Sequence, residues 1–139
     1  MKEFAELNFD KEVSYTKTHE WAKKTGNIVR IGVDDYAQSA LGDIVYVELP
    51  SVGGAVNAGA AFGSLESTKA VSDLNSPVSG VVVKVNDALS DNPELINSSP
   101  YGDGWIIDVE VKGDSDFDAL LKSDAYAEYV KTLEPIEAN

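Results

Sequence analysis

The sequence predicts a mostly β protein: a flattened barrel of two small sheets with a lysine-bearing hairpin, a short helix near residues 34–41, and helices at the C-terminus. Three observations support this prediction. Short β-branched runs separated by Gly, Pro and Asn fill the middle of the chain. Apolar residues at helical spacing are few and lie mainly near the C-terminus. Two similar runs, 42–47 and 80–85, both begin with Gly and flank a central pair of strands at 61–66 and 71–75.

The first two long strands are expected to form a hairpin. Val29, Ile31 and Val33 alternate with other residues, which places them on one face of a strand. The turn triplet 25–27 precedes this strand. Residues 15–23 are therefore expected to pair with it.

A short helix and a third strand follow. Asp34 is a suitable N-cap for the helix, and Gly42 is a suitable end. Residues 43–49 are apolar and β-branched and stop at Pro50, which is typical of a strand.

The remaining elements are two more strands and the C-terminal helices. Residues 80–85 form one predicted strand, and the other runs from 105 to 111 with Trp105, Ile107, Val109 and Val111 inward and Asp108 and Glu110 outward. Helical spacing joins Phe117, Leu120 and Leu121, and then Tyr126, Tyr129, Val130 and Leu133, with Ser123 as a candidate cap. The large aromatic residues expected in the core are Trp21, Tyr46, Phe62 and Trp105.

Composition narrows the function classes. The chain has 139 residues, of which 24 are acidic and 11 basic, for a formal net charge of −13. This acid excess argues against nucleic acid and anionic membrane surfaces as partners, because both are bound by clustered Lys and Arg. The absence of cysteine excludes a disulfide scaffold, a thiol nucleophile and a cysteine-ligated metal.

The length suits one domain spanning residues 1–139, and we expect a soluble monomer. No apolar run approaches the roughly 18 residues of a membrane span. The acidic start has no apolar segment of the kind found in secretory signals. These features favour the bacterial cytoplasm, or the mature form of a mitochondrial protein.

One turn presents a single long side chain. Leu65 and Val71 are symmetric about Thr68, and the residues between them are small or polar apart from Lys69. This pattern is typical of a tight turn. Spacing alone leaves two readings open: an ordinary solvated lysine, or an amine accessible to a modifying enzyme.

The residues around this turn resemble the lipoylation segment of the glycine cleavage system H protein family. The matching motifs, in chain order, are 15–21, 35–38, 41–50, 66–70 with 72–73, 76–80 and 97–105. The resemblance covers roughly residues 13–129. It implies the hybrid barrel-sandwich fold of that family and lipoic acid in amide linkage to Lys69. It also implies that Glu66 helps lipoate-attaching enzymes to recognise the turn and that Gly63 and Gly80 shape it.

The resemblance implies a carrier rather than an enzyme. Such a carrier takes the aminomethyl group of glycine from a PLP-dependent decarboxylase to a tetrahydrofolate-dependent aminomethyltransferase. A dihydrolipoyl dehydrogenase then reoxidises it. The alternative within the same resemblance is a relay of lipoyl groups to other lipoyl-dependent complexes. An independent enzyme would have to be built on His19, the single histidine, which we read as a surface or packing residue.

The aminomethyl group that such a carrier holds is cationic and prone to hydrolysis. A carrier gains by folding its loaded arm against carboxylates in a cleft. By motif position, Glu20 and Asp73 are the candidates for this contact. Ala40 stands where other family members can have a polar side chain, so any contact from that position is lost.

Overall fold

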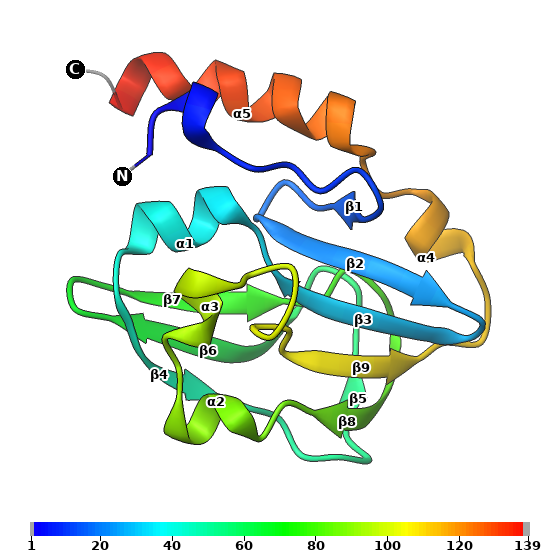
Figure 1. Ribbon diagram of the computed structural model, residues 1–139. Helices are drawn as coiled ribbons and strands as arrows, with labels where there is room; N and C mark the ends of the chain where they lie inside the picture. Colours follow the sequence, from blue (N-terminus) through cyan, green and yellow to red (C-terminus); the bar gives the residue numbers. More distant parts are fainter. Residues whose placement is uncertain (1, 138–139) are drawn as a thin grey trace.

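The structure is a computed structural model that describes the backbone of residues 2–137 and the side chains of residues 2–133 (Figure 1). Its strands are β1 (Ser14–Tyr15), β2 (Glu20–Thr25), β3 (Ile28–Val33), β4 (Ile44–Glu48), β5 (Ala55–Val56), β6 (Ala61–Ser67), β7 (Val71–Asn75), β8 (Gly80–Val85) and β9 (Ile107–Glu110). Its helices are η1 (Phe4–Glu6), α1 (Asp35–Leu41), α2 (Ala88–Asp91), α3 (Leu95–Ser98), α4 (Ser115–Asp118) and α5 (Ser123–Glu137).

Two antiparallel sheets form the body of the molecule, which confirms the mostly β fold. One sheet has six strands in the order β1-β2-β3-β9-β8-β5, and the other has three in the order β4-β6-β7. The sheets are thus unequal, and within the described residues neither closes on itself to complete a barrel. A buried apolar core that includes Val29, Ile31 and Val33 lies within this sandwich.

The predicted strand 15–23 is in fact two strands. A turn over Thr16–His19 separates β1 from β2, and the two pair with each other through Tyr15 and Trp21. The turn is closed by bonds from the His19 and Glu20 amides to the carbonyl and hydroxyl oxygens of Thr16, respectively. β2 then pairs with β3 as expected, through a hairpin that runs from Thr25 to Ile28.

The prediction for residues 105–111 is correct in part. Ile107, Val109 and Val111 are buried, but the strand begins at Ile107, and Trp105 is only partly buried. Asp108, expected to face outward, is 7% exposed because Arg30 covers it with two hydrogen bonds. The guanidinium carbon of Arg30 also lies 4.0 Å from the centre of the Trp105 ring. This stack accounts for the position of Trp105 outside the main core.

A second, aromatic core lies beneath α5. It contains Val13, Tyr15, Trp21, Tyr36, Tyr126 and Val130. Figure 1 shows α5 running over the N-terminal segment and the β1–β2 edge. Trp21 is therefore a core residue as expected. Tyr46 is 54% exposed on β4, so the expectation that it is buried is wrong, and Phe62 is only partly buried.

Helix α1 agrees with the caps expected from sequence. Asp34 accepts a 2.8 Å hydrogen bond from the Ala37 amide at the start of α1. Gly42 ends this helix with a φ of 79°, a conformation that glycine adopts without strain. α4 and α5 confirm the C-terminal helices, but Ser123, the expected cap, is the first residue of α5 rather than the residue before it. Among the described residues, no helix has the length and apolar character needed to cross a membrane.

Candidate lysine attachment site and adjoining pocket

Lys69 lies at the tip of the β6–β7 hairpin. The Ser67 amide donates to the Ala70 carbonyl at 2.8 Å, and the Ser67 hydroxyl accepts from the amides of Lys69 and Ala70. Thr68, Lys69 and Ala70 are all exposed. No carboxylate in the described part of the chain forms an ion pair with Lys69. The turn thus holds its own backbone in place and leaves the amine accessible, as predicted.

The tip of the hairpin is tied to the connection between α1 and β4. The Thr68 amide donates to the Asp43 carbonyl at 3.1 Å. The Lys69 stem passes Gly42: a Cβ atom placed on that glycine would lie 3.7 Å from Lys69 Cε. Lys69 therefore lies beside the C-terminal end of α1.

A pocket of about 180 Å³ lies next to this end of α1. Its walls come from β2 and the turn before it, and from β3, α1, β6 and β7. The lining residues are Thr18, His19, Glu20, Val33, Tyr36, Ala37, Ala40, Leu41, Leu65, Ser72, Asp73 and Leu74. Glu20 and Asp73, 53 positions apart in the sequence, thus line one cavity. Ala40 lines it too and places only a methyl group there.

The two carboxylates sit in different environments. Glu20 is 1% exposed, and its Oε1 atom accepts hydrogen bonds from the hydroxyls of Thr16 and Thr18. Its Oε2 atom accepts from the Asn75 amide at 3.1 Å. Burial raises the pKa of Glu20, and these hydrogen bonds oppose the rise. Asp73 is exposed on β7.

His19 packs among aromatic rings and lines the same pocket. Its Nδ1 atom lies 2.6 Å from the Tyr126 hydroxyl, and its ring centre is 4.7 Å from that of Tyr36. Burial lowers its pKa to about 4, so the imidazole is neutral at pH 7. The structure thus places His19 as a packing residue, and it also places it in the pocket wall, which the sequence did not indicate.

Gly63 and Gly80 lie on strands away from the turn. A Cβ atom on Gly63 would come to 2.2 Å from the Glu48 carbonyl oxygen, and one on Gly80 to 2.2 Å from the Glu110 carbonyl oxygen. Both glycines therefore allow neighbouring strands to approach. Glu66 is exposed on β6, beside Tyr46 and Val71 in the register of the three-stranded sheet. Its role in recognition by lipoate-attaching enzymes stays a prediction.

A model of the glycine cleavage H-protein family matches residues 13–133. The chain belongs to this family. Its sequence is 48% identical over 128 residues to the glycine cleavage system H protein of Anaeromyxobacter sp. (strain K), covering 92% of this chain and 100% of the relative. It is 51% identical over 127 residues to a mitochondrial glycine cleavage system H protein of Oryza sativa subsp. indica, covering 91% of this chain and 76% of the relative.

A solved structure supports the same assignment. The crystal structure of a glycine cleavage system H protein from Mycobacterium marinum superposes with a TM-score of 0.80 at 42% sequence identity. The match covers 88% of this chain and 98% of that one. Membership of the family makes this chain a component of a glycine cleavage system.

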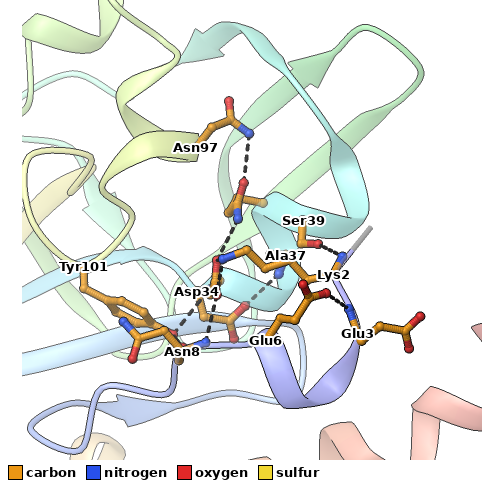
Figure 2. A network of polar contacts seen from close by, with 11 residues as sticks. Lys2, Glu3, Glu6, Asn8, Asp34, Ala37, Ser39, Asn97 and Tyr101 are labelled. Atoms are coloured by element: carbon orange, nitrogen blue, oxygen red, sulfur yellow. Dashed lines mark hydrogen bonds and ion pairs between the residues drawn. The ribbon is translucent and has the colours of Figure 1, made fainter.

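Asn97 supports the bend between α1 and β4, a role that the sequence did not indicate. Its Oδ1 atom accepts from the Ile44 amide, and its Nδ2 atom donates to the Gly42 carbonyl and to Gln38 Oε1. It therefore fixes the bend between α1 and β4 that receives the hydrogen bond from the Lys69 turn. Figure 2 shows Asn97 at one end of a polar network that continues along α1 to Lys2 in the N-terminal segment. In the sequence, 97–102 is an ordered loop motif, but nothing in it identifies this distant partner.

Proposed function

We propose that this chain is a lipoyl carrier of the glycine cleavage system, with lipoic acid joined by an amide bond to the Lys69 amine. The observation that carries the proposal is the position of an exposed, unpaired lysine beside a cavity that contains a buried carboxylate. The small neighbours of Lys69 leave room for an attaching enzyme. The residues present therefore fit the group that the family implies.

When bound, the lipoyl group supplies a disulfide that accepts the aminomethyl group of glycine from the PLP-dependent decarboxylase and presents it to the tetrahydrofolate-dependent aminomethyltransferase, and dihydrolipoyl dehydrogenase restores the disulfide. The chain itself supplies attachment and positioning. Tethering at Lys69 replaces free diffusion by a high effective concentration at each partner. These three enzymes, together with lipoate-attaching enzymes, are the proposed partners of a monomeric carrier.

The pocket supplies what a cationic cargo needs. Glu20 is held in place by three hydrogen bonds and offers a negative charge in a site of low dielectric, where its attraction to an ammonium group is little screened. Asp73 lines the same pocket and is a second carboxylate residue there. Leu41, Leu65 and Leu74 line the rest of the cavity and limit the access of water to the cargo.

The proposal is tested first by mass. Incubation with lipoate and a lipoate-attaching enzyme is expected to add about 188 Da, and peptide mapping is expected to place the addition on Lys69. An unmodified chain after this treatment would contradict the proposal.

Reconstitution with the three enzymes then tests the role. The lipoylated chain is expected to support exchange between glycine and labelled bicarbonate, and the unlipoylated chain is not. A lipoylated chain that fails in this exchange but donates its lipoyl group to other lipoyl proteins would favour the relay. Glycine turnover by the unlipoylated chain alone would show an enzyme.

A further inference from the structure

His19 has an unusual backbone conformation. Among the described residues, it is the one residue other than glycine with a positive φ, at 77°. This region costs of order 1 kcal/mol or more for a residue with a side chain, and it is found most often where the surroundings fix it. Here the His19 amide donates to the Thr16 carbonyl, and the His19 carbonyl accepts from the Asp34 amide. The chain therefore holds His19 in this conformation from both sides.

The His19 ring is fixed as firmly as its backbone. Tyr126 contacts Nδ1 at 2.6 Å and is itself fully buried, with its ring stacked on Tyr15 at 4.4 Å. Tyr36 and Tyr129 lie against the imidazole. Such packing leaves the ring one orientation.

The second ring nitrogen is available. Within residues 2–133, Nε2 of His19 has no hydrogen-bond partner, and the one buried side-chain polar atom without a partner is Asp34 Oδ2. Nε2 is therefore not sealed inside the protein. The cavity that His19 lines is the pocket that also contains Glu20 and Asp73.

The Tyr126 hydroxyl can either donate to Nδ1 of His19 or accept from it. Asp34 is completely buried, and its Oδ1 atom accepts from the Ala37 amide. The Tyr126 hydroxyl lies close enough to hold down the pKa of Asp34 against the effect of burial. A cation at Nε2 requires the arrangement in which the Tyr126 oxygen accepts from Nδ1–H of His19. Nε2 then carries the lone pair, because a neutral imidazole has one donor and one acceptor nitrogen.

We propose that His19 binds the cargo: its Nε2 atom accepts a hydrogen bond from the ammonium group that the arm brings into the pocket, and Tyr126 positions the ring for this contact. The inference rests on the proposed carrier function, since the amine reaches the pocket only on an arm attached to Lys69. A neutral ring suits this role, because an imidazolium would repel the cation. Glu20 and His19 would thus contact the ammonium group together, the first by charge and the second by a directed lone pair.

Two substitutions distinguish the contribution of Nδ1 from that of Nε2. His19→Asn places an amide where Nδ1 lies and tolerates a positive φ, but has nothing at the position of Nε2. His19→Gln extends an amide to the position of Nε2. We expect the amine-loaded His19→Asn holoprotein to lose its cargo about tenfold faster than the wild type, as for loss of one hydrogen bond to a charged group. We expect His19→Gln to stay within about threefold of the wild type. Equal lifetimes for the wild type and both variants would overturn the inference.

The ¹⁵N resonances of the His19 ring provide a readout that does not depend on transfer. In the loaded holoprotein, Nδ1 is expected to be protonated and Nε2 unprotonated, and the Nε2 signal is expected to differ from that of the unlipoylated protein. A protonated Nε2, or no movement on loading, would overturn the role of His19. Failure of lipoylation itself would be seen in the mass and would refute the carrier function instead.

Discussion

The β6–β7 hairpin that carries Lys69 and the pocket wall are adjacent, but they are stabilised by different kinds of contact. The turn that carries Lys69 is exposed, and its bonds are largely local: the Ser67 hydroxyl accepts from the amides of Lys69 and Ala70. The pocket wall is buried, and its contacts join distant parts of the chain, such as His19 and Tyr126, which are 107 residues apart. A segment that an outside enzyme must modify has to be accessible and locally stable. A pocket proposed to hold a reactive cargo has to be ordered by the whole fold.

The largest effect should come from the tip of the hairpin. Lys69→Arg keeps the charge but removes the primary amine that forms the amide, so lipoylation and glycine–bicarbonate exchange are expected to fall to zero. Because Lys69 is exposed, the melting temperature should stay within about 1 °C of the wild type. Intact mass and differential scanning calorimetry measure the two outcomes. A variant that remains lipoylated would move the attachment site elsewhere.

Substitution of Gly63 and Gly80 tests whether these glycines are needed for the stability of the fold or for lipoylation of the turn. Gly63→Ala and Gly80→Ala bring a Cβ atom to 2.2 Å from a carbonyl oxygen, and each is expected to lower the free energy of unfolding by about 2–4 kcal/mol. Gly113→Ala is the matched control, because its Cβ would meet no atom within 4 Å, and about 0.5 kcal/mol or less is expected. Urea unfolding measures all three. Lipoylation of the folded fraction should be unchanged, and a selective loss of lipoylation at full stability would restore the role in shaping the turn.

The pKa shifts of His19 and Asp34 predict opposing dependences of stability on pH. Burial holds the pKa of His19 at about 4, below its ordinary 6.5, so its contribution to stability is lost as the pH falls from 6.5 to 4. Burial raises the pKa of Asp34 from 3.8 to about 7, so its contribution is lost as the pH rises through that range. Each effect is on the order of 3 kcal/mol.

Two variants separate these contributions. Between pH 4 and 7, Asp34→Asn should make stability rise more steeply with pH than in the wild type, and His19→Asn should make it rise less steeply or fall. Asn still caps α1, so the first change does not remove the cap. Urea unfolding at several pH values measures both slopes, and Glu20 contributes equally to every curve. Slopes that match the wild type in both variants would contradict the assignment of the two shifts to these groups.

The smallest expected effects are on the rate of cargo loss when either carboxylate of the pocket is replaced. Glu20→Gln removes a buried charge while keeping groups that can bond Thr16, Thr18 and the Asn75 amide, and the loaded cargo is expected to be lost about tenfold faster. Asp73→Asn removes an exposed charge that water and salt already screen, and an effect of about twofold is expected. Release of formaldehyde from the loaded holoprotein measures both rates. The reverse order would place the cargo at the rim of the pocket.

The sequence predicted the elements that depend on local chemistry. The strands at 61–66, 71–75 and 80–85, the N-cap Asp34, the stop at Gly42 and the exposed lysine turn all agree with the structure. These features follow from alternation, turn residues and capping, which are read over a few neighbouring positions. The pairing of Glu20 with Asp73 in one pocket came from motif position, since no local pattern joins residues so far apart.

The errors lie where long-range contacts outweigh local patterns. Trp105 follows the alternation of the next strand, yet it leaves the core to stack beneath Arg30, and Asp108 is buried by the same arginine. Tyr46 is aromatic and in a strand, but its face of the three-stranded sheet is open. The sequence does not predict the contact between His19 and Tyr126, because that contact forms only once α5 has docked.

The hydrogen bond from the Thr68 amide to the Asp43 carbonyl has a mechanical consequence. It anchors the tip of the hairpin to a bend that Asn97 already secures, so the base of the arm is a fixed pivot. In the proposed carrier, the reach of the lipoyl group would then be set by the rotatable bonds of the lysine and the lipoyl chain alone. Each proposed partner enzyme would then have to bring its own active site within that reach.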